Sequence, residues 1–120
     1  MITVLVVDDV PSQVELISVY LQDSGYNVIR ANNAREALQK TVEQKPDVIV
    51  TDVVMSGMNG FQLCRSLKKN PATRQLPVVL CTGRNQELDR IWGIRQGADL
   101  YITKPFTREE IVKAIRSVIA

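Results

Sequence analysis

Short apolar runs rich in Val and Ile alternate with longer amphipathic segments along the whole sequence. The apolar runs cover residues 3–7, 27–31, 48–50, 77–81 and 100–102. Continuous apolar runs of this length are typical of strands buried on both faces of a sheet. A helical segment of about ten residues after each strand predicts right-handed βαβ units. The sequence therefore predicts a single doubly wound α/β domain, with five parallel strands and five helices on both faces of the sheet.

Capping residues mark the expected helix boundaries. Pro11 suits the first turn of the first helix, which should end at Ser24 and Gly25. The expected N-caps of the other four helices are Asn33, Asn59, Asn85 and Thr107. Thr107 forms a capping box with Glu110, and Gly97 suits the position just after the fourth helix. The second helix has its apolar positions at Ala34, Ala37, Leu38 and Val42, and the fourth at Leu88, Ile91 and Trp92.

Composition limits the remaining choices. The chain has 120 residues, 45% hydrophobic and 23% charged, which is enough for one globular domain with one core. It carries no basic leader at its start and no apolar run near the roughly 20 residues of a membrane span, so we expect a cytoplasmic protein. Cys64 and Cys81 are expected to be free, buried thiols. The absence of histidine excludes His-based metal sites and His general bases.

The net charge of +2 hides an uneven distribution. Residues 1–60 contain four basic and eight acidic residues, whereas residues 61–120 contain eleven basic and five acidic ones. The basic charges of the second half are spread along the sequence and lack interleaved aromatic residues. Nucleic-acid binding is therefore not favoured.

Polar residues follow four of the five predicted strands. They are Asp8 and Asp9, Asp52, Thr82, and Lys104. The carboxyl ends of parallel strands lie at one edge of a sheet, which is where ligands bind in such folds. Three carboxylates suit Mg²⁺, and a lysine and a threonine hydroxyl suit a phosphoryl group. With no P-loop and no obvious general base, the set favours phosphoryl transfer onto a carboxylate.

Simpler interpretations of these acidic residues remain open from position alone. Asp52 could end a strand and cap the following loop, since Asp is common in turns. Asp8 and Asp9 could form a solvated turn. If they are held together, two carboxylates about 4 Å apart repel by ~4 kcal/mol at an effective dielectric constant near 20, and a cation would relieve that repulsion.

The complete set of residues resembles the receiver domain of bacterial response regulators, of the stand-alone CheY type. The resemblance covers the whole chain, residues 1–120, and includes the run from Gly97 to Phe106 that leads into Lys104. It implies a flavodoxin-like sheet of order 2-1-3-4-5 and a receiver with no output domain. It also implies that Asp52 is the phosphoacceptor, that Asp9, Asp52 and the backbone carbonyl of Val54 bind Mg²⁺ directly, and that Asp8 assists through water.

The same resemblance assigns the remaining site residues. Lys104 would pair with the phosphoryl group, Thr82 would move toward it, and Tyr101 would be the aromatic switch that follows Thr82. The Lys104–Pro105 peptide bond is expected to be cis. The implied function is a phosphorylation-activated switch of a two-component system, which receives its phosphoryl group from a sensor histidine kinase or a phosphotransfer protein. It would act on a downstream protein target through its fourth helix, fifth strand and fifth helix, as a monomer.

Several positions depart from the family pattern or vary within it. Ser56 replaces a common Pro, and Gly83 replaces a common Ala. Val54 offers no group to position water and Arg84 could shield a phosphate, so we expect slow self-hydrolysis. The run from Trp92 to Ala98 is similar to stand-alone receivers of type IV pilus chemotaxis systems. Trp92 then marks either a docking surface or a partly buried core position.

The residues argue against three other functions. A degenerate receiver that no longer takes phosphate is not favoured, because every reactive position is filled. An aspartate-nucleophile phosphohydrolase would need a second carboxylate at position 54, where this chain has Val54. A flavodoxin-type carrier would need a phosphate-binding loop rich in Ser, Thr and Gly after the first strand, where this chain has Asp8 and Asp9. The sequence therefore favours a signalling switch over an enzyme or a cofactor carrier.

Overall fold

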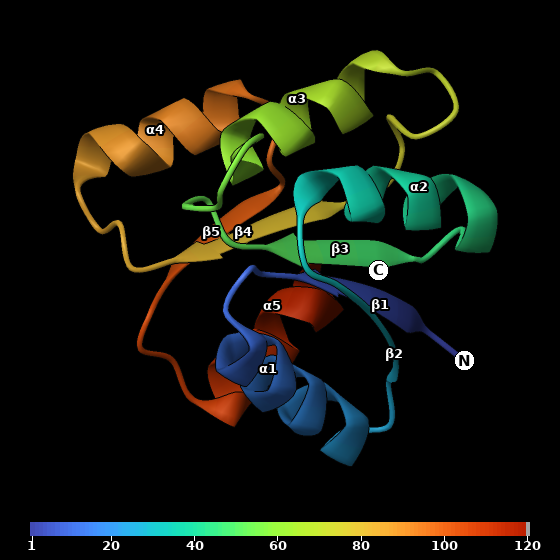
Figure 1. The fold of residues 1–120 in the computed structure, drawn as a ribbon. Helices are drawn as coiled ribbons and strands as arrows, with labels where there is room; N and C mark the ends of the chain where they lie inside the picture. Colours follow the sequence, from blue (N-terminus) through green and yellow to red (C-terminus); the bar gives the residue numbers. More distant parts are fainter. Residues whose placement is uncertain (120) are drawn as a thin grey trace.

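The computed structural model describes residues 1–119. Its strands form one parallel sheet in the order β2-β1-β3-β4-β5 (Figure 1). They are β1 (Thr3–Val7), β2 (Asn27–Ala31), β3 (Val48–Thr51), β4 (Val78–Thr82) and β5 (Leu100–Thr103). The predicted fold class, the parallel pairing and the flavodoxin-like strand order are confirmed.

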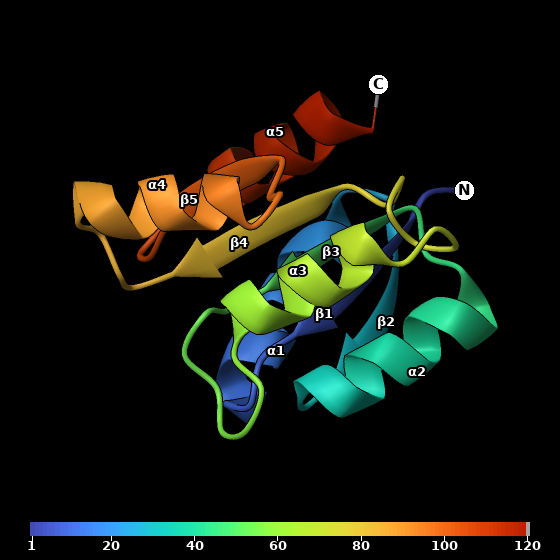
Figure 2. The ribbon, with the colours of Figure 1, turned by 90° about the horizontal axis from the view of Figure 1, so that it is seen from above.

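The helices cover both faces of the sheet. They are α1 (Pro11–Asp23), α2 (Ala34–Gln44), α3 (Gly60–Lys69), α4 (Glu87–Arg95) and α5 (Arg108–Val118). Helices α1 and α5 lie on one face, and α2, α3 and α4 lie on the other, with α4 at the β5 end of the sheet (Figures 1 and 2). No helix among residues 1–119 is both long and apolar enough to cross a membrane.

Alternating side chains of the central strands build a core on each face. Val4 and Val6 of β1 pack with α1 and α5, whereas Leu5 and Val7 pack beneath α2 and α3. All four side chains are almost completely buried, as expected for a parallel sheet covered on both faces. Burial on both sides fixes the register of the central strands, because a shift by one residue would exchange the two faces.

Most predicted helix ends are confirmed. Asn33, Asn59 and Thr107 each accept a hydrogen bond from the backbone amide three residues later. Gly97 has a φ of +102°, as expected of the glycine that follows a helix. The predicted capping box of Thr107 and Glu110 is present, because the Glu110 carboxylate accepts from the Thr107 amide.

Other boundaries differ from the prediction. Strand β4 begins at Val78, because Pro77 has no amide hydrogen and only its carbonyl joins the ladder, by accepting from the Ile49 amide. The strand also continues to Thr82, whose carbonyl accepts from the Lys104 amide at 2.8 Å. The N-cap of α4 is Gln86 and not Asn85, since Asp89 lies three residues after Gln86 and its carboxylate accepts from the Gln86 amide.

Four of the predicted apolar helix positions are solvent-exposed. Val42 of α2 is 60% exposed, and Thr41 takes the inward position with its hydroxyl donating to the Ala37 carbonyl. Helical geometry explains this, since Ala34, Ala37 and Thr41 share one face and Val42 lies beside it. The apolar positions of α4 are also exposed, and Gly93 is its single buried residue.

Candidate functional site

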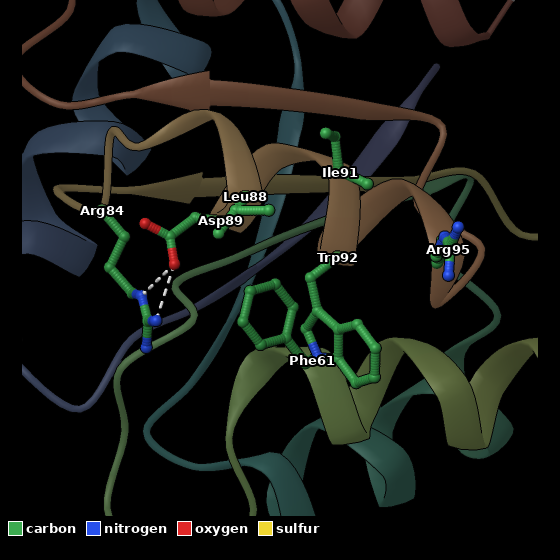
Figure 3. Close-up of a pocket in the computed structure, with 7 residues that line it drawn as sticks. All are labelled: Phe61, Arg84, Leu88, Asp89, Ile91, Trp92 and Arg95. Carbon is green, nitrogen blue, oxygen red and sulfur yellow. Dashed lines mark hydrogen bonds and ion pairs between the residues drawn. The ribbon is translucent and has the colours of Figure 1, made fainter.

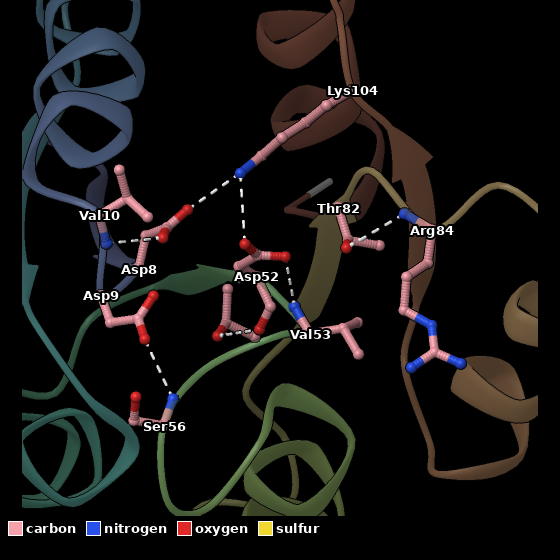
Figure 4. Close-up of polar contacts among 10 residues, drawn as sticks. Asp8, Asp9, Val10, Asp52, Val53, Ser56, Thr82, Arg84 and Lys104 are labelled. Carbon is pink, nitrogen blue, oxygen red and sulfur yellow. Dashed lines mark hydrogen bonds and ion pairs between the residues drawn. The ribbon is translucent and has the colours of Figure 1, made fainter.

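The predicted site residues converge where β1, β3, β4 and β5 end (Figure 4). Val7 of β1 lies opposite Thr51 of β3, so the next residues, Asp8 and Asp52, emerge side by side. Thr82 lies opposite Thr103 in the same way, which brings Lys104 to the same edge. The sheet register therefore assembles residues that are up to 96 positions apart in the sequence.

Asp8 is the most buried carboxylate of the site. Its side chain is 1% exposed, and it accepts hydrogen bonds from the Val10 amide at 3.0 Å and from Lys104 Nζ at 2.9 Å. Burial raises the pKa of Asp8 above its ordinary value of 3.8, although the Val10 amide and Lys104 act in the opposite direction. A buried carboxylate of this kind gains from any additional positive charge placed beside it.

Asp52 lies next to Asp8, directly after β3. One carboxylate oxygen accepts from the Val53 amide at 2.7 Å, and the other lies 3.4 Å from Lys104 Nζ. The Asp52 side chain is 12% exposed, so it remains reachable from solvent at the carboxyl edge of the sheet. The proposal that Asp52 merely caps its own loop explains the Val53 contact but not the approach of Lys104.

Lys104 connects the two carboxylates. Burial by itself lowers the pKa of Lys104, but the hydrogen bond to Asp8 and the charges of Asp52 and Asp8 outweigh it, so the pKa is raised above 10.5. The side chain therefore remains a cation throughout the physiological range. The Lys104–Pro105 peptide bond is cis, as expected from the sequence.

Asp9 and Val54 lie at the open side of the site. The Asp9 carboxylate accepts from the Ser56 amide at 3.0 Å, which ties the loop after β1 to the loop after β3. The Val54 side chain is 59% exposed and makes no polar contact. Ser56 thus has a structural role that the sequence did not reveal, because its contribution is a backbone amide.

Thr82 and Tyr101 both form hydrogen bonds with the backbone of Arg84. The buried Thr82 hydroxyl oxygen accepts from the Arg84 amide at 3.3 Å, and the Tyr101 hydroxyl donates to the Arg84 carbonyl at 2.6 Å. Burial raises the pKa of Tyr101 above its ordinary value of 10.0, so its hydroxyl stays protonated as a donor. The Arg84 guanidinium binds Asp89 at 2.6 Å and lies over the Phe61 ring, away from Asp52 (Figure 4).

Gly60 is a positioning residue that was not predicted from the sequence. Its amide donates to the Val53 carbonyl at 2.8 Å, and a Cβ atom at this position would lie 2.1 Å from the Asp52 carbonyl oxygen. Only glycine allows α3 to begin so close to the backbone of Asp52. A glycine at the first helical position, where better helix formers are available, was the available signal.

The acidic residues fit a divalent cation by their chemistry. Asp8, Asp52 and the ammonium of Lys104 leave one negative charge in a partly buried volume. The exposed Asp9 adds a second one nearby in sequence, and all the donor atoms are oxygens. Within residues 1–119 no group of three or more His, Cys, Asp or Glu residues is placed to hold a metal together. The carboxylates do not form a closed ligand cage, but their oxygens suit Mg²⁺, because this ion needs only one or two carboxylates and keeps several waters.

Comparison with known proteins places this geometry in a family. The family model described as "Response regulator receiver domain" matches residues 4–116. The chain belongs to the response regulator receiver family. The resemblance inferred from Asp8, Asp9, Asp52, Thr82 and Lys104 is confirmed at the level of the family.

Individual relatives support the same assignment. Protein PilH of Pseudomonas aeruginosa is 40% identical over 120 residues, covering 100% of this chain and 99% of PilH. The transcriptional regulator PhoB of the same organism is 38% identical over 98% of this chain. The matched region makes up 51% of PhoB. Among solved structures, a putative response regulator from Chloroflexus aurantiacus has a TM-score of 0.94 and is 33% identical in sequence. The match covers 98% of this chain and 96% of the Chloroflexus chain. The chemotaxis protein CheY4 of Vibrio cholerae has a TM-score of 0.93 with 34% identity and 98% coverage of both chains.

Proposed function

We propose that this receiver is a signalling switch that accepts a phosphoryl group on Asp52 with Mg²⁺ bound beside it. The observation that carries the proposal is the position of Lys104, whose ammonium lies within 2.9 Å of Asp8 and 3.4 Å of Asp52. An ammonium that bridges a buried carboxylate and a reachable one is poised to hold a phosphoryl oxygen once Asp52 is modified. A loop-capping aspartate would have no need of it.

The proposed reaction is a transfer between a phosphohistidine and a carboxylate. A carboxylate oxygen of Asp52 attacks phosphorus, the P–N bond breaks, and the imidazole leaves with the electron pair, so that Asp52 becomes an acyl phosphate. Asp9, Asp52 and the Val54 carbonyl would hold Mg²⁺ directly and Asp8 through water. The bound ion would neutralise charge on the phosphoryl oxygens.

Thr82 and Lys104 would stabilise the product. The Lys104 ammonium pairs with one phosphoryl oxygen, and the Thr82 hydroxyl donates to another. The Thr82 hydroxyl also accepts from the Arg84 amide, so a movement of Thr82 toward the phosphoryl group would pull on the Arg84 segment or break this bond. Since the Arg84 carbonyl also accepts from Tyr101, a shift of this segment would release Tyr101 and change the surface of α4, β5 and α5.

The proposed partners follow from this change of surface. A sensor histidine kinase or a phosphotransfer protein would supply the phosphoryl group in the cytoplasm, and a downstream protein would read the altered surface of a monomeric receiver spanning residues 1–120. Similarity to PilH and to the chemotaxis protein CheY4 favours control of motility. The resemblance of the Trp92 segment to receivers of type IV pilus systems points the same way.

An intact-mass measurement tests the chemistry. The protein is incubated with Mg²⁺ and acetyl phosphate, and the Asp52→Asn variant is treated in parallel. We expect one added phosphoryl group on the wild type and none on the variant. Asp23→Asn is the matched control, since Asp23 is exposed and far along α1. Equal labelling of wild type and Asp52→Asn, or none in either, would refute the proposal.

The lifetime of the acyl phosphate provides a second measurement. Val54 is apolar and exposed, so it cannot orient an attacking water, and we expect slow self-hydrolysis, on the scale of minutes or longer. Shielding of the phosphate by Arg84 is not supported by this conformation, because the Arg84 guanidinium binds Asp89. A lifetime of seconds would contradict the expectation for Val54.

A further inference from the structure

A groove of about 590 Å³ lies between α3 and α4, outside the phosphorylation site. Its apolar lining consists of Phe61 from α3 and Leu88, Ile91 and Trp92 from α4 (Figure 3). Phe61 is 7% exposed and forms the floor, whereas Leu88 is 75% and Trp92 is 50% exposed. The lining includes no residue of β5 or α5, so the groove lies on the α3 side of α4 and shares only α4 with the surface of α4, β5 and α5.

The apolar side chains that α4 contributes to this groove have no covering element among the described residues. Helix α4 buries only Gly93, and its large apolar residues remain at least 39% exposed. Side chains of this size are usually buried, and an exposed apolar patch beside a groove marks an interaction site. A groove between two helices accepts an amphipathic helix, which inserts side chains three or four residues apart.

Charges around the groove are unevenly neutralised. The acidic residues of this region are paired within the chain: Asp89 with Arg84, Glu87 with Arg90, and Asp99 with Lys68. The first of these pairs closes one end of the groove, where Arg84 and Asp89 face each other (Figure 3).

The other end of the groove carries uncompensated positive charge. Arg95 lines both the groove and a second hollow of about 460 Å³, which Arg65 and Lys69 also line. Arg65, Lys69 and Arg95 form no ion pair with any residue between 1 and 119. The apolar groove therefore continues into a basic hollow, where these three cations are unpaired within the described part of the chain.

We propose that the groove between α3 and α4 docks an acidic amphipathic helix of a partner protein. Apolar side chains of that helix would lie on Leu88 and Trp92, and its carboxylates would face Arg65, Lys69 and Arg95. An anionic membrane fits less well, because the apolar side chains line a hollow between two helices, which suits an inserted helix better than a flat lipid surface.

A binding titration with designed peptides tests the proposal. The probe is a fluorescein-labelled helix of about 16 residues, with Leu and Phe every three or four positions among Glu residues. A second peptide has the same apolar positions with Lys in place of Glu. We expect micromolar binding of the acidic peptide to the unphosphorylated wild type, and at least tenfold weaker binding of the basic one. Emission from Trp92, the chain's single tryptophan, should shift to shorter wavelength as the groove fills.

Variants locate the binding. Leu88→Glu and Arg95→Glu should each lower the affinity for the acidic peptide by about tenfold. Leu88→Glu removes an apolar contact, and Arg95→Glu reverses a charge at the rim of the groove. Val42→Glu on α2 and Arg116→Glu on α5 are matched controls at exposed positions, and both should bind as the wild type does. The triple variant Arg65→Glu, Lys69→Glu, Arg95→Glu should reverse the preference and bind the basic peptide. Urea denaturation of each variant checks that it is folded.

Other outcomes would overturn the proposal. They are absence of acidic-peptide binding, equal binding of both peptides, or binding that Leu88→Glu and Arg95→Glu leave unchanged. Binding to phosphatidylglycerol vesicles in place of the peptide would assign the groove to a membrane surface. A dimer in sedimentation that Leu88→Glu abolishes would assign it to a second copy of this chain. Because the titration uses unphosphorylated protein, its outcome is independent of the chemistry proposed for Asp52.

Discussion

Helices α4 and α5 flank the same strand, β5, but they are held in different ways. Helix α5 has a capping box at Thr107 and buries Ile111, Val112, Ala114 and Ile115 against the sheet and α1. Helix α4 buries only a glycine, and its large side chains face solvent. The two helices have similar length, so the difference lies in their contacts with the core and not in their size.

The contrast indicates which helix can change position at low cost. Apolar burial fixes α5, whereas α4 depends on the close approach of Gly93 to Leu80 and Tyr101 and on the pairing of Arg84 with Asp89. Regions with few buried apolar contacts open with less free energy than the core. A surface that must respond to phosphorylation would be built from such a region.

The largest expected difference concerns apolar truncation in the two helices. Ile115→Ala should lower the free energy of unfolding by ~2–5 kcal/mol, because Ile115 is completely buried and a cavity would remain. Leu88→Ala should change it by less than ~0.5 kcal/mol, since the side chain is already exposed. Urea denaturation measures both values. Similar losses for the two variants would remove the distinction between the helices.

The close approach at Gly93 gives the next largest effect. A Cβ atom there would lie 2.8 Å from Leu80 Cδ1 and 3.0 Å from Tyr101 Cδ2, and Leu80 is fully buried. We expect Gly93→Ala to destabilise the protein by ~1–2 kcal/mol, because overpacking outweighs the gain in helix propensity. Gly83→Ala is the control, since nothing lies within 4 Å of its Cβ position. If Gly93→Ala proves stabilising by thermal denaturation, α4 is free to move outward and its spacing from the sheet is not fixed by this contact.

Thiol labelling compares the two regions in the native protein. Burial raises the pKa of Cys64 and of Cys81 from 9.0 to about 12, so each reacts at pH 8 only when its surroundings open. The Cys64 thiol lies 3.5 Å from the Gln96 carbonyl at the end of α4, whereas Cys81 packs in the core beneath α1 and α5. We expect Cys64 to react about tenfold faster with iodoacetamide, as read by mass spectrometry of peptides.

The pH dependence of this labelling follows from the same pKa values. In the open form the thiols regain a pKa near 9, so the labelling rate should rise with pH between 7 and 9 for both residues. Because the folded-state pKa is raised, the folded protein is favoured below pH 9 and loses stability as the pH rises toward 12. Equal rates for Cys64 and Cys81 would show that both regions open together.

The smallest expected effect is that of the Arg84 ion pair. Arg84→Ala removes a partly exposed pair with Asp89 and should cost less than ~1 kcal/mol of global stability. Its local effect should be visible by hydrogen exchange, as faster exchange of the α4 amides with the α5 amides unchanged. Val42→Ala on α2 serves as the control. A uniform increase in exchange across both helices would contradict a local role.

The fold was largely predictable because each strand and most helix ends carry local signals. Asn33, Asn59 and Thr107 act as caps from their own side chains, so the sequence alone locates those helix starts. The start of α4 was misplaced by one residue because its boundary depends on Asp89 reaching back to Gln86. The exposure of Val42 was also not predictable from local sequence, because the face of α2 that packs on the core is formed by Ala34, Ala37 and Thr41.

The site residues were predictable as a set, but their interactions were not. The sequence shows that Asp8, Asp52, Thr82 and Lys104 each end a strand, and parallel pairing then requires them to meet. It did not show that Ser56 contributes an amide to Asp9, and it marked Gly60 only as an unusual start of a helix and not as a contact of the Asp52 carbonyl. Both contributions come from the backbone, which has the same chemistry at every position.

The sequence by itself determined that this chain forms a covered parallel sheet and that acidic, hydroxyl and ammonium groups gather at one of its edges, because strand periodicity and strand ends are local properties. Only the tertiary structure decided that Lys104 lies between Asp8 and Asp52, and that Arg84 turns toward Asp89 and Phe61. It alone decided that the apolar residues of α4 remain exposed beside a basic hollow. Those outcomes depend on which segments are already packed around each side chain, and that information is distributed over the whole molecule.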